Sequence, residues 1–158
     1  MSMPQEEHVR REMSVSTIRN GTVIDHIPSA ATFKVAQILQ VEREKGMVTV
    51  GTNLASGRLG KKGIIKIESR ELTPDEVNKI ALLAPAATVN IISNYKVVEK
   101  SRVELPERIE RIVKCFNPRC ISNQQPIPTR FDVVQDCPPA LRCQYCERVM
   151  RGDEITLK

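Results

Sequence analysis

Cys115-Phe-Asn-Pro-Arg-Cys120 and, 22 residues further on, Cys143-Gln-Tyr-Cys146 decide how the last third of this chain folds. Two close thiol pairs separated by a loop can build a tetrahedral site for one zinc ion. Four protein thiolates would fill every ligand position, which is typical of a structural site and not of a catalytic one. The sequence therefore predicts one structural Zn2+ per chain, with the ligands Cys115, Cys120, Cys143 and Cys146.

Two other interpretations of these cysteines are free buried thiols and the disulfides of a secreted protein. The charged start MSMPQEEHVRRE contains no apolar run, so we expect no signal peptide. No stretch approaches the roughly 18 apolar residues of a membrane span. We therefore expect a cytoplasmic protein with no membrane partner, where paired cysteines favour metal over disulfides. Cys137 has no partner at ligand spacing and is interpreted as a non-ligand.

The distribution of cysteine along the 158 residues predicts two domains. All five cysteines follow residue 114, whereas the earlier sequence has periodic apolar segments of its own. We expect a disordered tail over residues 1–13, a first domain over 14–103 and a zinc domain over 104–158. The second piece has few apolar residues and would depend on metal for stability, as small domains commonly do.

The first domain alternates between strand and helix signals. Thr73-Pro74-Asp75-Glu76 is a strong helix start, with an N-cap, a proline at the first helical position and a capping box. Apolar periodicity and turn residues predict a further helix over 30–41, a Gly-containing loop over 54–60, and strands over 14–18, 22–27, 47–51, 62–68, 88–93 and 95–101. This order predicts an α+β, ferredoxin-like antiparallel sheet with two helices on one face.

The second domain is predicted to be small and all-β. We expect a strand over 109–114 that leads into the first cysteine pair, and a last strand over 148–157. The loop between the pairs contains four prolines, and its expected buried anchors are Phe131, Val133 and Val134.

The net charge of +5 and the pI of about 9.1 indicate a mild basic excess. Residues 14–101 carry 12 Lys/Arg against 8 Asp/Glu, and residues 102–158 carry 10 against 8. A zinc module that grips nucleic acid should itself be basic, so this distribution argues mildly against nucleic acid as a partner. An aromatic content of 3%, without tryptophan, also argues against a base-stacking platform.

Lysines of the first domain could converge on a small anion. Lys62 and Lys66 are four residues apart on a predicted strand, which places both on one face of the sheet. Two ammonium groups suit a polyphosphate, and Asp25 could accept a hydrogen bond from a ribose hydroxyl or an exocyclic amine. The alternative is that these are ordinary solvated charges and that His26 is structural.

Five segments and the four cysteines together closely resemble the regulatory chain family of aspartate carbamoyltransferase. The segments begin with Gly21-Thr-Val-Ile-Asp-His-Ile-Pro28 and Lys62-x-x-x-Lys66-Ile-Glu68. They continue with Leu83-Ala-Pro85-x-Ala-Thr-Val-Asn90, Asn94-Tyr95-x-Val-Val-x-Lys100-Ser-Arg102 and Leu105-Pro-Glu-Arg-Ile109. The match runs from about Val15 to the C-terminus, with independent motifs in the same order.

The resemblance implies a non-catalytic subunit of a pyrimidine-biosynthesis enzyme. An allosteric domain would bind CTP and ATP at one site, the zinc domain would dock on the catalytic chain, and regulatory chains would form homodimers. The nucleotide-binding residues implied by position are Val15, Ser16, Thr17, Ile18, Asp25, His26, Lys62, Lys66, Asn90, Ile92, Tyr95, Val97 and Lys100. Asn20 and Ile91 stand where some members of the family carry a basic residue.

Two alternatives come from other classes of protein. A zinc-ribbon nucleic-acid-binding protein would show salt-dependent binding to DNA or RNA. An enzyme in its own right would need a catalytic constellation around Asp25 and His26, but no catalytic motif is found in the sequence.

Overall fold

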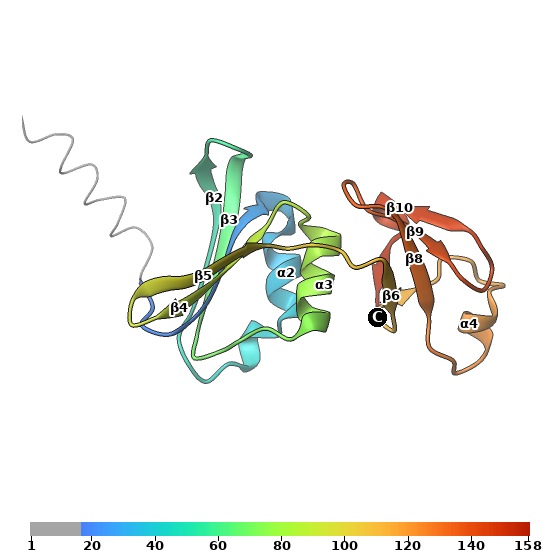
Figure 1. Ribbon diagram of the computed structural model, residues 1–158, viewed down its shortest axis with the longest axis horizontal. Helices are drawn as coiled ribbons and strands as arrows, with labels where there is room; N and C mark the ends of the chain where they lie inside the picture. The colour runs from blue at the N-terminus through green and yellow to red at the C-terminus, as the bar shows by residue number, and fades with distance from the viewer. Residues whose placement is uncertain (1–16) are drawn as a thin grey trace, which may run out of the picture. The chain divides into compact units, whose positions relative to one another are not determined.

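The computed structural model describes residues 17–158, and the chain divides into two compact units (Figure 1). The first unit comprises the chain up to Leu72 together with Ala87–Arg102. The second comprises Thr73–Ala86 and Val103–Lys158. The segment Thr73–Ala86 therefore groups with the later sequence, although it lies within the expected first domain over 14–103.

A five-stranded antiparallel sheet forms the first unit. Its strands are β1 (Gly21–Pro28), β2 (Val48–Ser56), β3 (Gly60–Glu68), β4 (Thr88–Ser93) and β5 (Lys96–Arg102). The spatial order is β2-β3-β1-β4-β5, so β1 lies at the centre and β2 and β5 at the edges. Alternation of side chains sends Ile24, Ile65 and Ile67, all fully buried, to one face of this sheet.

Helix α2 (Thr32–Ile38) contacts β2 and β3 and buries Val35 and Ala36. The sequence predicted one helix over 30–41, but α2 is flanked by 3-10 turns at Ser29–Ala31 and Val41–Arg43. The interruption after α2 falls at Gln40, whose φ of 51° lies in the left-handed region that a continuous helix cannot contain.

Helix α3 (Pro74–Leu83) begins at the predicted capping box. The Thr73 side chain accepts a hydrogen bond from the Glu76 N–H at 3.2 Å, and the Glu76 carboxylate accepts one from the Thr73 N–H at 3.0 Å. Leu82 of this helix belongs to the hydrophobic core of the second unit.

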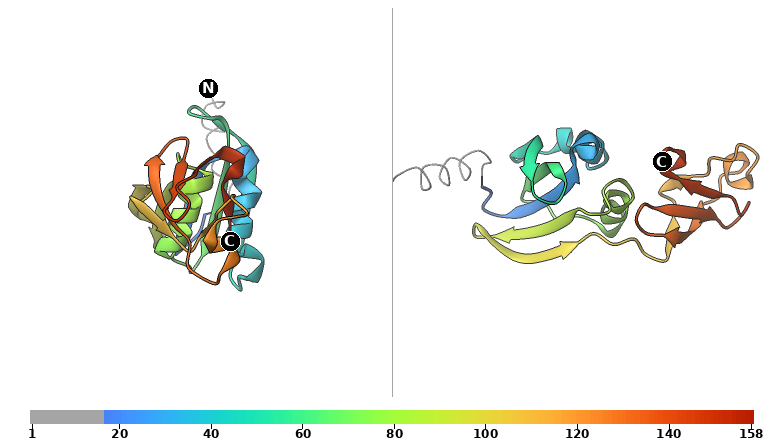
Figure 2. Two further views of the ribbon diagram at one scale, coloured as in Figure 1. Left: turned by 90° about the vertical axis from the view of Figure 1, so that its right-hand side faces the viewer. Right: turned by 90° about the horizontal axis from the view of Figure 1, so that it is seen from above.

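The strands of the second unit are short, and Figure 2 shows them from two further sides. β6 (Arg108–Glu110), β8 (Arg130–Gln135), β9 (Ala140–Cys143) and β10 (Val149–Arg151) form one sheet in the order β10-β9-β8-β6. The remaining elements are β7 (Val113–Lys114) paired with β11 (Thr156–Leu157), the short helix α4 (Ile121–Gln124) and a 3-10 turn at Gly152–Glu154. Three cysteines, Cys115, Cys120 and Cys143, are part of its buried core.

The predicted fold class is confirmed: an antiparallel sheet with two helices is followed by a small β domain with a four-cysteine cluster. Among the described residues, no helix is long and apolar enough to cross a membrane.

Four details of the sequence prediction are wrong, and a fifth lies outside the described residues. The expected loop over 54–60 is partly strand, because β2 continues to Ser56 before the turn. Val134 is 44% exposed, so it is not the buried anchor that was expected. The expected last strand is interrupted at Gly152, where a φ of 53° breaks an extended chain. Thr17 and Ile18 precede β1 without forming a strand, and the expected tail over 1–13 lies outside the described residues.

Candidate nucleotide site and metal centre

A row of paired residues crosses the face of the sheet that points away from Ile24 and Ile65. Lys66 on β3 is paired with Val23 on β1, and Val23 is paired with Asn90 on β4. Asn90 is in turn paired with Lys100 on the edge strand β5. Because directly opposed residues project to the same side of a sheet, Lys66, Asn90 and Lys100 share this face.

A bulge in β1 places Asp25 and His26 next to this row. The pairing of β1 with β3 shifts register between Ile24 and Ile27, and His26 has a φ of 57°. Bulges bend a strand and re-aim side chains, and they are frequent beside functional sites. The Lys62 ammonium lies 2.9 Å from one carboxylate oxygen of Asp25 and 3.1 Å from the other. The backbone N–H of His26 donates to Asp25 at 2.6 Å.

Burial and charge together set the ionisation of these groups. Burial tends to raise the pKa of Asp25, but the bonds from Lys62 and from the His26 N–H outweigh it and lower the pKa below its usual value. Burial lowers the pKa of His26, and Lys62, Arg58 and Lys100 lower it further, against the opposing charge of Asp25. The pKa of Lys66 is lowered by burial, which Asp25 opposes.

The lowered pKa values of His26 and Lys66 have the same physical meaning. The site penalises further positive charge, because its cations are partly desolvated or lie close to one another. A bound anion would relieve that penalty.

The imidazole of His26 is held by a 3.0 Å hydrogen bond between its Nδ1 and the hydroxyl of Thr88.

A small apolar cluster completes this face of the sheet. Ile18, Val23 and Ile64 are buried together, and Leu54 and Ile92 pack against them. Ile64 lies on β3 between Lys62 and Lys66, so apolar and basic groups alternate along one strand face. Such an arrangement can contact a planar ring and a phosphate chain at the same time.

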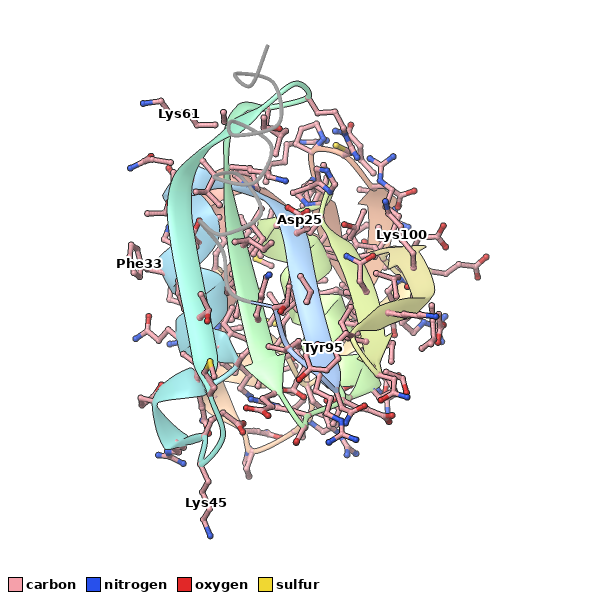
Figure 3. All side chains as sticks on the ribbon, turned by 90° about the vertical axis from the view of Figure 1, so that its left-hand side faces the viewer. Asp25, Phe33, Lys45, Lys61, Tyr95 and Lys100 are labelled. Carbon is pink, nitrogen blue, oxygen red and sulfur yellow. The ribbon has the colours of Figure 1, made fainter. Side chains whose placement is uncertain are left out.

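Most of the predicted nucleotide residues lie on this one face. Figure 3 shows Asp25 and Lys100 near one end of the strands and Tyr95 towards the other end. Tyr95, 66% exposed, sits in the β4–β5 turn, and Val97 pairs with Ile92 across the same hairpin. Thr17 is exposed and Ile18 is buried, whereas Val15 and Ser16 lie outside the described residues.

Thr88, Val23 and Ile64 also lie at this face, and they are not among the residues that the sequence predicted for it. Thr88 is detectable only once β4 is paired with β1, because its place beside His26 depends on residues 62 positions apart. Ile64 had a local signal, since it lies midway between two lysines that were expected on one strand face.

The second unit brings the four predicted cysteine ligands together. The sulfurs of Cys115 and Cys146 are 3.7 Å apart, as are those of Cys120 and Cys143, and all four lie within 4.8 Å of one another. A disulfide requires about 2.05 Å. A tetrahedron with Zn–S bonds of about 2.3 Å has sulfur–sulfur edges of about 3.8 Å, so the set fits zinc. Cys137 is exposed and is not part of the cluster.

Hydrogen bonds organise the loops that carry these thiols. The Asn123 side-chain amide donates to the carbonyls of Cys115 and Asn117, both at 2.8 Å. Burial raises the pKa of Cys115 and of Cys143. Burial also acts to raise the pKa of Cys146, but hydrogen bonds, the Arg148 N–H first among them, lower it to about 7. Ionising all four thiols in one buried cluster therefore requires a cation.

Two family models match the chain in succession. The model described as aspartate carbamoyltransferase regulatory chain, allosteric domain, matches residues 13–104. The model described as aspartate carbamoyltransferase regulatory chain, metal binding domain, matches residues 107–156.

Curated proteins of the same description are similar over nearly the whole length. The aspartate carbamoyltransferase regulatory chain of Pyrococcus horikoshii is 52% identical over 146 residues, which covers 91% of this chain and 96% of that protein. That of Porphyromonas gingivalis is 49% identical over 148 residues, covering 94% and 98%. That of Bacteroides thetaiotaomicron is 46% identical over 148 residues, covering 94% and 97%.

Proposed function

Since this chain belongs to the aspartate carbamoyltransferase regulatory chains, we propose that its first unit binds CTP and ATP in competition at the face of the sheet that carries Asp25, Lys62, Lys66 and Lys100. The chain is regulatory and not catalytic, and it has an allosteric and a metal-binding domain. The observation that carries the proposal is the row Lys66–Val23–Asn90–Lys100 beside the Asp25–Lys62 pair.

Each part of the nucleotide finds chemistry that suits it. The ammonium groups of Lys62, Lys66 and Lys100 make charge-assisted bonds to phosphate oxygens. Asp25 accepts a hydrogen bond from a ribose hydroxyl, and its carboxylate is held in place by Lys62. The base lies over the apolar cluster, where Ile18, Ile92, Tyr95 and Val97 provide its contacts and Asn90 provides a polar group.

The metal of the second unit is proposed to be one structural Zn2+ bound by Cys115, Cys120, Cys143 and Cys146. Zinc would supply cross-links between segments and would leave no coordination position for substrate. Cys115 follows β7, Cys120 precedes α4, Cys143 ends β9, and Cys146 lies in the turn before β10, so one ion would tie these four places together. Thiolates of this kind persist in a reducing cytoplasm, which we propose as the compartment.

The catalytic chain is the proposed partner of the second unit. A metal-ordered surface of short strands and loops offers a docking site whose shape depends on zinc, since small metal domains fold only when loaded. A nucleotide that favours one arrangement of the regulatory chains would then bias the catalytic chain through a coupling free energy between the two sites.

The proposed homodimer uses the edge strand β2. The sequence Val48-Thr-Val-Gly-Thr-Asn-Leu-Ala-Ser56 contains no charged residue, whereas β5 carries Lys96, Glu99, Lys100 and Arg102. Charged edges resist pairing with another chain and uncharged edges permit it. Beside β2, Phe33 is 67% exposed and Met47 is 54% exposed, which gives a second chain apolar surface to cover.

The decisive test is calorimetric titration of the zinc-loaded chain with CTP, with and without saturating ATP. We expect one site per chain from which ATP displaces CTP, and about tenfold weaker binding in a Lys100→Ala variant, because a charge-assisted bond is lost. The matched control is Lys34→Ala, since Lys34 is exposed on α2 and does not belong to the site. Folded, zinc-loaded chain that binds neither nucleotide would refute the proposal, and salt-dependent binding of DNA or RNA would favour the zinc-ribbon alternative.

A further inference from the structure

The turn between β2 and β3 carries a cation that the proposed site has not used. The strands pair through Leu54 with Lys62 and through Ser56 with Gly60, so the turn residues Gly57, Arg58 and Leu59 follow directly. The turn is closed by a 3.2 Å hydrogen bond from the Leu59 N–H to the hydroxyl of Ser56. Arg58 is exposed, so its guanidinium can reach a ligand from solvent.

The direction of β3 brings this turn to the end of the lysine row. Towards the N-terminal end of β3, Lys62 follows Lys66 on the same face, and the turn that contains Arg58 lies beyond Lys62. A phosphate chain that begins at the level of Lys66 and Lys100 and extends past Lys62 therefore approaches the turn.

The charge of Arg58 also reaches the proposed site. Its charge acts on His26, where it contributes to a lowered pKa after burial and alongside Lys62 and Lys100. The neighbouring Lys61 projects from the other face of the sheet, because side chains alternate along β3 and Lys62 faces the site. Figure 3 shows the side chain of Lys61 pointing away from Asp25 and Lys100.

The ion pair between Lys62 and Asp25 limits what Lys62 can contribute to phosphate binding. Lys62 is shared with the Asp25 carboxylate, so part of its field is neutralised before any ligand binds. An arginine presents a permanently charged planar fork that matches the oxygens of a terminal phosphate. Its effect should depend on ligand length, because the turn lies beyond Lys62 and a longer phosphate chain extends further along this face.

We propose that Arg58 binds the terminal phosphate of a nucleoside triphosphate and makes this site discriminate triphosphates from monophosphates. The inference rests on the proposed nucleotide function and assigns a specificity-determining residue to it.

The test is to titrate the zinc-loaded full chain with CTP and with CMP in the wild type, Arg58→Ala and Lys61→Ala. Arg58→Ala should weaken CTP binding by about fivefold, the loss expected for an exposed charge pair, while CMP binding stays within about twofold. Lys61→Ala, which removes the same charge one strand position beyond the turn, should leave the ratio of CTP to CMP affinity unchanged.

The outcomes distinguish failure of the proposed role of Arg58 from failure of the nucleotide site itself. A CTP to CMP ratio that is the same in Arg58→Ala as in Lys61→Ala overturns the role of Arg58 and leaves the nucleotide site standing. Failure of the wild type to bind CTP overturns the nucleotide function and the role of Arg58 with it. Both substitutions are at exposed positions of a hairpin, and an unchanged melting temperature would show that the fold is retained.

Discussion

Asp25 and Lys62 form an ion pair across neighbouring strands, with 2.9 Å between the ammonium nitrogen and the nearer carboxylate oxygen. The two side chains are 20% and 21% exposed, so water screens the pair only in part. The pair joins the bulge of β1 to β3 and orients the carboxylate that the proposed ribose contact needs.

Asp25→Asn should lower the free energy of unfolding by about 1 kcal/mol at pH 7, because Lys62 loses a partly buried partner. The folded-state pKa of Asp25 is lowered, so its contribution is complete above the unfolded value of 3.8 and disappears as the pH falls through the folded pKa. Urea denaturation at pH 7 and at pH 3 checks both statements, with Glu99→Gln on exposed β5 as the control. An equal loss at both pH values would contradict this account of the pair.

His26 should make triphosphate binding stronger as the pH falls from 8 towards 6. Burial and nearby cations lower its pKa in the free chain, and a bound polyanion would raise it, so ligand binding takes up a proton. Calorimetry of CTP binding in two buffers of different ionisation enthalpy measures that uptake. His26→Asn removes the titrating ring and retains a residue that tolerates the left-handed backbone at φ 57°.

The phosphate groups of the ligand titrate in the same pH range, so the comparison between wild type and His26→Asn decides the matter. Proton uptake that is identical in the two proteins would assign it wholly to the nucleotide.

Removing one thiolate should release the metal and unfold the second unit. Cys146→Ser replaces a sulfur of the cluster with a poorer zinc ligand, whereas Cys137→Ser changes an exposed cysteine that is not part of the cluster. We expect one zinc per chain in the wild type and in Cys137→Ser, and little zinc in Cys146→Ser, by elemental analysis. Circular dichroism should show loss of structure in Cys146→Ser alone. Full zinc content in Cys146→Ser would exclude it as a ligand.

Phe33→Glu should convert the proposed dimer of regulatory chains to monomers. The side chain is 67% exposed, so the charge costs the isolated fold little but would be buried unpaired at an interface. Sedimentation analysis of the zinc-loaded chain checks this, and Val98→Glu, at a 61% exposed position of the other edge strand, is the control. Dissociation by Val98→Glu in place of Phe33→Glu would move the interface to β5.

The parts of the fold that depend on local chemistry could be predicted from the sequence. The Thr73 capping box and the placement of Lys62 and Lys66 on one strand follow from short-range rules, and both are found. The spacing of the cysteines indicated the cluster for the same reason, since each pair lies within a single turn of chain.

The remaining features depend on pairing between distant segments. The bulge at Asp25 and His26 lies in the pairing of β1 with β3, where the register shifts between Ile24 and Ile27, and no residue of β1 indicates it in the sequence. The end of α2 at Ile38, shortly before the left-handed Gln40, was missed because the apolar period continues to Val41. Thr88 and Arg58 gain their places only through sheet register.

The division of the chain into units has a mechanical consequence. The backbone passes between the two units three times, at residues 72–73, 86–87 and 102–103, and Leu82 is buried in the core that also contains three of the cysteines. A gene fragment that stops at Arg102 would therefore encode α3 without the core in which Leu82 is buried. Three backbone connections therefore join the two units, so neither unit can be cut out of the chain at a single peptide bond.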